Sequence, residues 1–120
     1  MYKRQVYKTD NGKITVVSVL YNYGDENQAL KQIWDKMPQA ANTETELPQA
    51  ISLDDFYPED KDYYNFEGSL TTPPCTEGVN WIVFKNQETV SKEQVEKFTQ
   101  TLGFKNNRPI QDTNGRQIKE

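Results

Sequence analysis

The chain contains no histidine and a single cysteine, Cys75, among its 120 residues. A protein-bound catalytic zinc needs imidazole, thiolate or carboxylate ligands that converge on one point. One cysteine and scattered carboxylates do not form such a set, so we expect no zinc site built from this chain alone. A lone cysteine also excludes an internal disulfide, and by residue type Cys75 is expected to be a small buried hydrophobic residue.

Basic clusters and long apolar runs are also lacking. The net charge is −4, from 14 basic and 18 acidic residues, without a basic run, so nucleic acid is not an expected partner. No apolar run approaches the roughly 18 residues of a membrane span, and no signal peptide is recognisable. Hydrophobic residues make up only 34%, but 12% aromatic residues argue against disorder, and the length suits one domain.

The most distinctive stretch is Tyr64–Trp81, which reads Tyr-Asn-Phe-Glu-Gly-Ser-Leu-Thr-Thr-Pro-Pro-Cys-Thr-Glu-Gly-Val-Asn-Trp. An aromatic, strand-like segment runs into Gly68 and is followed by two threonines and two prolines. The prolines fix their own φ and disfavour helix in the residue before each, so we expect a stiff, extended segment from Leu70 to Cys75. An X-Pro bond here is a candidate for the cis form.

Alternating apolar residues and β-branched residues predict strands at Tyr2–Thr9, Lys13–Tyr23, Tyr63–Ser69, Val79–Lys85 and, briefly, Glu88–Val90. The turn signal Asp10-Asn11-Gly12 separates the first two. The second strand is largely apolar on both faces, so we expect it to be central and covered on each side.

Helical spacing predicts helices at Gln28–Met37 and Lys92–Leu102 and a helical turn within Ile51–Tyr57. Ser91–Gln94 has the capping-box pattern, and Gly103 is a typical helix end. In the helical turn we expect Leu53 and Phe56 to point inward. Strands interleaved irregularly with a few helices predict an α+β fold with a mostly antiparallel sheet rather than a doubly wound one.

The segment Phe-Glu-Gly-Ser-Leu-Thr-Thr-Pro-Pro-Cys-Thr-Glu-Gly-Val-Asn-Trp-Ile-Val closely resembles the active-site wall of α-class carbonic anhydrases, especially bacterial ones. The resemblance extends from about Val6 to Lys119 and covers only the C-terminal half of such an enzyme. It implies one partial domain over residues 1–120, with part of a twisted, mainly antiparallel sheet and peripheral helices. The strand at Val6 would then form an exposed edge.

In that family three imidazoles hold a Zn²⁺ ion, which lowers the pKa of its bound water to about 7. The resulting hydroxide attacks CO₂ against an apolar wall and forms bicarbonate. A threonine hydroxyl accepts the hydroxide proton and passes its own to a carboxylate. The resemblance implies that Thr71 is this catalytic threonine, whereas residue type alone would favour a local structural role.

The resemblance also implies a set of substrate-binding positions: Thr71, Thr72, Leu70, Val79, Trp81, Val16 and Val6. The apolar members match the wall on the CO₂ side, and each is equally expected as a core residue. Glu77 is expected to fix the loop rather than to act as an acid or base.

The sequence departs from the family where the third zinc ligand belongs. Alignment of Val6-Tyr7-Lys8 with the His-Phe-Val-His-Lys of relatives places Arg4 at that position. A guanidinium has donors only and cannot bind a metal. The other two ligands, the carboxylate and the proton-shuttle position lie upstream in the family. We therefore expect zinc in the full-length enzymes, but neither zinc binding nor CO₂ hydration by this chain.

Two functional hypotheses follow. The chain is either a C-terminal fragment of a zinc-dependent α-carbonic anhydrase, with the missing N-terminal half as its partner, or a catalytically inactive, carbonic-anhydrase-related binding module. In extracellular and bacterial relatives the matching cysteine pairs with one near the N-terminus. The resemblance therefore implies that Cys75 comes from an exported parent, either periplasmic or secreted.

Residues 1–5 have a separate interpretation. The run Tyr2-Lys3-Arg4-Gln5 is what the codons TAT-AAG-AGA-CAG encode, and these codons match the end of a common sequencing-library adapter. One hypothesis is that residues 1–5 are an artefact joined to a truncated gene, and the other is that they are a native basic N-terminus. An upstream reading frame that encodes histidines would support truncation.

Overall fold

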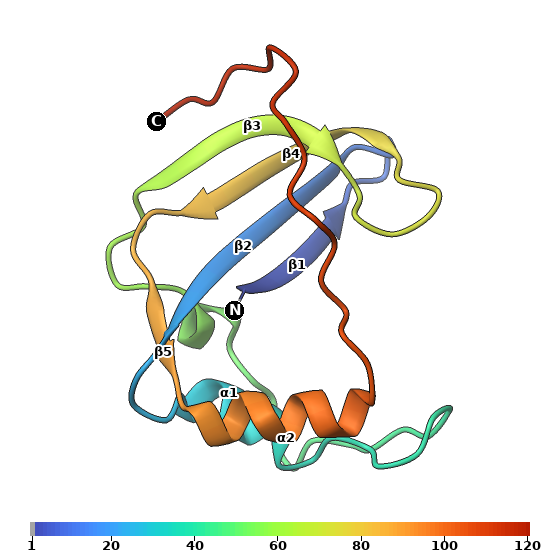
Figure 1. Cartoon of the computed structure of the whole chain (residues 1–120), viewed down its shortest axis with the longest axis vertical. Helices are drawn as coiled ribbons and strands as arrows, with labels where there is room; N and C mark the ends of the chain where they lie inside the picture. Colours follow the sequence, from blue (N-terminus) through green and yellow to red (C-terminus); the bar gives the residue numbers. More distant parts are fainter. Residues whose placement is uncertain (1) are drawn as a thin grey trace.

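The computed structural model describes residues 2–120, with side chains from Arg4 onward. Its sheet has the strand order β1-β2-β4-β3, and β5 pairs with β2 beyond this path (Figure 1). The strands are β1 (Tyr2–Lys8), β2 (Ile14–Tyr23), β3 (Tyr63–Ser69), β4 (Glu77–Phe84) and β5 (Glu88–Val90). The helical elements are α1 (Gln28–Trp34), the 3₁₀ turn η1 (Leu53–Phe56) and α2 (Lys92–Leu102).

The sheet is mixed. The β1–β2 and β3–β4 pairs are antiparallel and each runs over seven residue pairs. The β2–β4 and β2–β5 pairs are parallel and run over four and three. Antiparallel pairing therefore dominates, as predicted, but the two antiparallel pairs are joined at the centre of the sheet by a parallel contact. The prediction that β2 is central and that β1 lies at an edge is confirmed.

Strand β2 contributes to two apolar clusters, one on each face of the sheet. Val19 and Tyr21 belong to a cluster that also contains Leu30 and Trp34 of α1 and Phe56 of η1. Val16, on the opposite face, packs with two residues of β4 in a second, smaller cluster. Alternate residues of a strand point to opposite faces, which explains why β2 is apolar throughout.

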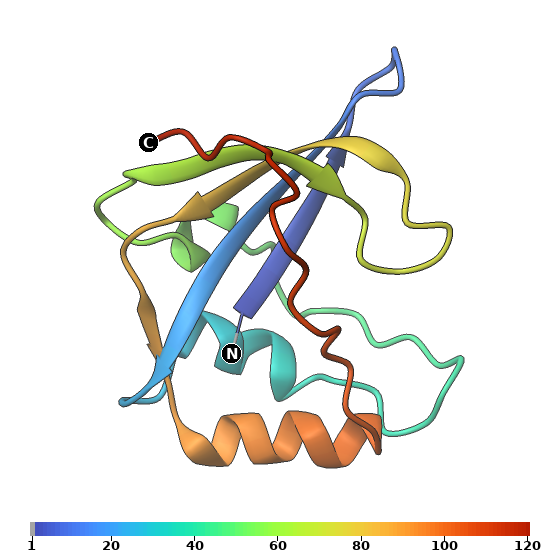
Figure 2. The same cartoon turned by 45° about the horizontal axis from the view of Figure 1, so that its top comes forward.

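The helices gather at one end of the sheet, near β5, while the tail that follows α2 runs back towards β3 (Figures 1 and 2). The tail reaches β3 through a bridge between Asn65 and Lys119, whose backbone groups exchange two hydrogen bonds of 2.8 Å. None of the helices in residues 2–120 is long and apolar enough to cross a membrane.

The predicted helix ends are partly confirmed. Ser91 and Gln94 form the capping box of α2, and Gly103 ends this helix with a φ of 73°. Helix α1 ends at Trp34 rather than at Met37. The N–H groups of Lys36 and Met37 bind the carbonyl oxygens three residues before them, as in a 3₁₀ turn, and not those four residues before them.

The helical turn η1 begins after Ser52, whose side chain accepts a hydrogen bond from Asp54 N–H. Phe56 is 2% exposed, as predicted, whereas Leu53 is 47% exposed. The prediction that Leu53 points inward is therefore wrong. Only the C-terminal end of this short turn packs against the larger cluster, which contains Phe56.

A buried glutamine joins the starts of the two helices. Gln94 is 7% exposed, and its Nε2 donates to the carbonyl oxygen of Asn27 at 2.9 Å. Its Oε1 accepts from the backbone N–H groups of Asn27 at 2.8 Å and Ser91 at 3.1 Å. The N–H groups of Asn27 and Ser91 have no acceptor within their helices, so the Gln94 amide provides one for both.

Replacing Gln94 by alanine should lower the free energy of unfolding by about 2 kcal/mol, because the part-buried N–H groups of Asn27 and Ser91 lose their acceptor, while Asn27 O keeps its bond from Lys31 N–H. Urea unfolding followed by circular dichroism measures this change. Gln100→Ala is the matched control, since Gln100 is an exposed residue of the same helix. Equal stabilities of the two variants would contradict the role of Gln94 as a link between the helices.

Tyr21 should make stability depend on pH in the alkaline range. Burial, reinforced by the nearby Glu88 carboxylate, raises the pKa of Tyr21 to about 12 from 10.0. The neutral phenol is favoured in the folded state, so this contribution is fully present below pH 10 and is lost as the pH rises through 12. The free energy of unfolding should fall by about 2 kcal/mol more in the wild-type chain than in Tyr21→Phe between pH 9 and 12. Parallel pH profiles of the two proteins would contradict this expectation.

Candidate functional site

The Thr71 loop, residues 70–76, joins β3 to β4. Its two ends are held together by a hydrogen bond from Leu70 N–H to Thr76 O at 2.8 Å, and within it Cys75 N–H donates to Thr72 O at 2.8 Å. The Pro73–Pro74 peptide bond is cis, in agreement with the sequence expectation of a cis candidate. A cis proline at the third position is the mark of a type VI turn. The loop is therefore a tight turn rather than the extended segment that was predicted.

Trp81 forms the centre of the wall beside this loop. Its indole Nε1–H donates to the carbonyl oxygen of Ser69 at 3.1 Å, and its ring stacks on Phe66 with centroids 6.0 Å apart. Only 8% of Trp81 is exposed. A buried indole N–H requires an acceptor, so this bond links the orientation of the ring to the backbone that leads into the loop.

The structure brings most of the predicted site residues together. Val16, Val79 and Trp81 form the smaller buried cluster, and Leu70 packs against it. Thr71 is half-buried and directly follows Leu70, two residues beyond the end of β3.

The two remaining predicted positions are open to solvent. Thr72 is exposed. Val6 is 61% exposed and lies directly opposite Val16 in the β1–β2 register, so that their side chains share a face. Glu77 is exposed at the first position of β4, where it pairs with Ser69 at the base of the loop.

Arg4 reaches this site from the edge strand. In the β1–β2 register it pairs with Ser18, on the same face as Val16. Its Nη1 donates a hydrogen bond to the Thr71 hydroxyl, and its guanidinium carbon lies 5.6 Å from the centroid of the Trp81 ring. A guanidinium stacks readily on an aromatic face, so both contacts suit its chemistry.

The donor set around Thr71 does not fit a zinc ion. Arginine offers N–H donors and a positive charge but no lone pair for a metal. Throughout residues 2–120, no three or more His, Cys, Asp or Glu side chains lie close enough together to hold a metal ion.

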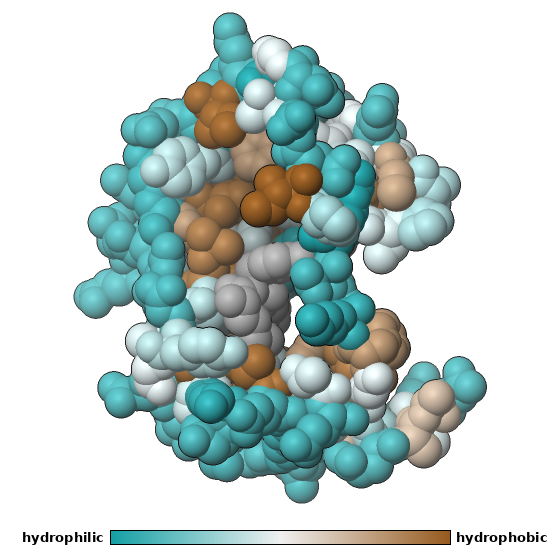
Figure 3. All heavy atoms as spheres, in the orientation of Figure 1, coloured by the Kyte–Doolittle hydropathy of each residue, from teal (hydrophilic) through white to brown (hydrophobic). Residues whose placement is uncertain are grey.

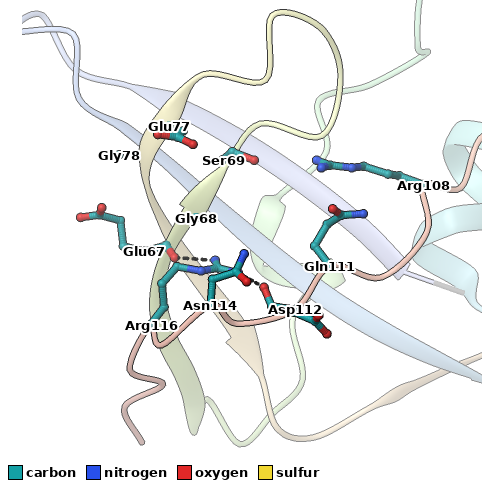
Figure 4. Close-up of a pocket in the computed structure, with 10 residues that line it drawn as sticks. All are labelled: Glu67, Gly68, Ser69, Glu77, Gly78, Arg108, Gln111, Asp112, Asn114 and Arg116. Carbon is teal, nitrogen blue, oxygen red and sulfur yellow. Dashed lines mark hydrogen bonds between the residues drawn. The ribbon is translucent and has the colours of Figure 1, made fainter.

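A polar cleft of about 360 Å³ lies behind the loop, between the strand ends and the C-terminal tail (Figure 4). Its lining consists of Glu67, Gly68, Ser69, Glu77, Gly78, Arg108, Gln111, Asp112, Asn114 and Arg116. Two short segments of this lining directly precede and follow the Thr71 loop. The cleft therefore lies where the C-terminal tail meets the end of β3 and the start of β4.

Some contacts around the site could not be predicted from the sequence. Arg116 binds backbone carbonyl groups of β3 and of the tail. On β1, Gln5 Oε1 accepts from the Tyr57 hydroxyl at 2.7 Å, and this hydroxyl lies 2.8 Å from that of Tyr7. Burial, followed by the hydrogen bond with Tyr7, raises the pKa of Tyr57 above its usual value. No local pattern signals these long-range pairs.

Figure 3 shows several groups of apolar residues on one face of the molecule, with hydrophilic residues around them.

Comparisons with known proteins identify the family. The family described as eukaryotic-type carbonic anhydrase matches residues 2–120. The chain is 42% identical to a carbonic anhydrase of Klebsiella pneumoniae and 43% identical to one of Neisseria gonorrhoeae, over 96% of this chain but only 47% and 45% of theirs. It matches the solved structure of an α-carbonic anhydrase from Thermovibrio ammonificans, in complex with the inhibitor sulfanilamide, with a TM-score of 0.93 and 44% identity. That match covers 98% of this chain and 52% of the other. The chain thus spans about half the length of the curated relatives it matches, and it belongs to the eukaryotic-type carbonic anhydrase family.

Proposed function

We propose that this chain is the C-terminal part of a zinc-dependent enzyme that reversibly hydrates CO₂ to bicarbonate. The observation that carries the proposal is the assembly of the Thr71 loop and the wall of Val16, Val79 and Trp81 at one place in a carbonic anhydrase fold. In the complete enzyme, this part would supply the threonine hydroxyl and the apolar surface, while the metal would come with residues outside it.

The proposed roles follow from simple chemistry. A hydroxyl both accepts and donates a hydrogen bond, so Thr71 can accept the proton of a nucleophilic hydroxide while it donates its own to another acceptor. Such an arrangement orients the attacking lone pair. CO₂ has no net dipole, so an apolar wall suits it better than polar groups do. Val16 and Val79 are almost fully buried and Leu70 packs against them.

We further propose that this chain alone neither binds zinc tightly nor hydrates CO₂. The sequence has no histidine, and the side chain that contacts the Thr71 hydroxyl is Arg4. A positively charged donor at this place repels a cation. The missing half of the enzyme would then bring the metal ligands and cover the β1 edge, where Val6 is exposed.

A second candidate is a binding module without catalysis. The contact between Arg4 and Thr71 favours it, because this contact engages the proposed catalytic hydroxyl within the chain itself. Size-exclusion chromatography and circular dichroism separate the two candidates. A folded, monodisperse monomer with a cooperative transition would favour the module, and an aggregating chain would favour the fragment.

The purified chain should show no CO₂ hydration above the buffer rate, with or without added zinc, because no metal-bound hydroxide can form. A stopped-flow assay with a pH indicator measures this, and elemental analysis after dialysis measures retained zinc. Turnover that a sulfonamide inhibits, or one equivalent of retained zinc, would contradict the proposal.

Joining residues 6–120 to the N-terminal part of the Klebsiella pneumoniae relative should produce CO₂ hydration, since that part would restore the metal site. In this chimera, Thr71→Val should lower kcat by about 100-fold through loss of the orienting hydroxyl. Thr76→Val is the matched control, because Thr76 is an exposed residue of the same loop and contributes its backbone carbonyl rather than its side chain.

An active chimera in which Thr71→Val and Thr76→Val have equal kcat would refute the catalytic role of Thr71. A folded chimera that binds zinc but does not turn over CO₂ would refute the proposed function as a whole.

A further inference from the structure

We propose that Arg116, in the C-terminal tail, is a positioning residue for Thr71. It fixes the end of β3, beside the register shift of the β3–β4 pair, from which the Thr71 loop leaves the sheet. The importance of this placement rests on the proposed function, but the contacts that carry the inference do not depend on catalysis.

Arg116 uses all three guanidinium nitrogens to bind backbone carbonyl groups. Its Nη1 donates to Glu67 O of β3 at 2.8 Å (Figure 4). Its Nε donates to Thr113 O at 2.8 Å and its Nη2 to Asp112 O at 2.9 Å, both within the tail. One planar group therefore joins the tail to the strand at a defined distance.

The strand needs such a partner because β3 lies at the edge of the sheet. The outward carbonyl groups of an edge strand have no neighbouring strand to bind. At Asn65 the backbone of Lys119 takes the place of that strand. Two residues further along the same edge of β3, the carbonyl oxygen of Glu67 accepts a hydrogen bond from the Arg116 side chain instead of from a backbone N–H.

The contact lies at the irregular point of the β3–β4 pair. The register shifts between Gly68 and Ser69, and a bulge interrupts the regular ladder of hydrogen bonds. A Cβ built on Gly68 would come within 3.0 Å of Trp81 Cδ1 and 3.3 Å of Arg116 Nη1, so both side chains lie against Gly68.

The bulge leads directly into the loop. On the side of the wall, Trp81 Nε1–H binds Ser69 O at 3.1 Å, and on the side of the tail, Arg116 binds Glu67 O. Thr71 follows two residues after Ser69. The backbone that leads to Thr71 is thus held at Glu67 by the Arg116 guanidinium and at Ser69 by the Trp81 indole.

Lysine could not replace Arg116. An ammonium is a compact point charge on a flexible stem, whereas the guanidinium presents its donors in a rigid plane. Arg108 offers a natural comparison. It lies in the same tail and lines the same cleft, but its side chain takes part in none of the hydrogen bonds or ion pairs identified within residues 2–120.

The test compares Arg116→Lys and Arg116→Gln with Arg108→Gln by hydrogen exchange followed by NMR, in the intact chain where it is a monomer and in the chimera of residues 6–120 where the chain alone aggregates. The two informative protons are the Trp81 Nε1–H and the Leu70 N–H, which close the bulge and the loop. In both Arg116 variants these protons should exchange at least about tenfold faster, while the amides of the β1–β2 ladder keep their rates. Arg108→Gln should leave all rates unchanged.

Gly68→Ala tests the same point without touching Arg116, because the added methyl group would displace the indole or the guanidinium. It should accelerate the same two protons. Wild-type rates in Arg116→Lys, or an equal acceleration of all amides, would overturn the positioning role, as would unfolding of the Arg116 variants alone. Failure here leaves the CO₂ hydration tests of Thr71 unaffected, so the two proposals can fail separately.

Discussion

The parallel contact between β2 and β4 is the constraint on which the rest of the structure depends. It sets Val16 beside Trp81 and thereby creates the apolar wall. The same contact places β2 between β1 and β4, in the interior of the sheet, where each of its faces packs in one apolar cluster. One face then receives the helices, and the other receives the Thr71 loop. The two faces of the sheet therefore differ: one carries the larger cluster with the helices, and the other carries the smaller cluster beside the Thr71 loop.

The site around Thr71 differs from a metal centre because a positively charged side chain contacts it. Zinc chemistry requires lone pairs that converge on a cation, whereas Arg4 brings a cation and donors to the Thr71 hydroxyl. The threonine, the indole and the valines of the wall are compatible with either situation, because their own packing and hydrogen bonds involve no metal ion. The wall can therefore keep its shape without a metal ion beside it.

The sequence predicted much of the local structure correctly. The capping box at Ser91, the strand pattern of β2 and a cis candidate among the X-Pro bonds all rest on short-range rules of backbone geometry. The extended form of the loop was a wrong prediction, because the chain turns back at the two prolines and Cys75 N–H binds Thr72 O. The preference of each proline for extended backbone is local, and this turn overrides it.

By itself, the sequence determined most of the elements, both ends of α2 and the residue types of the wall, since periodicity and capping act over a few neighbouring residues. The tertiary structure alone decided that β2 and β4 pair in parallel, that Arg4 reaches Thr71, and that Arg116 binds Glu67. These contacts join residues distant in the chain, and no local preference encodes them. They form because burial of the two apolar faces brings the strands together, and polar groups at the strand ends then lie within hydrogen-bond reach of one another.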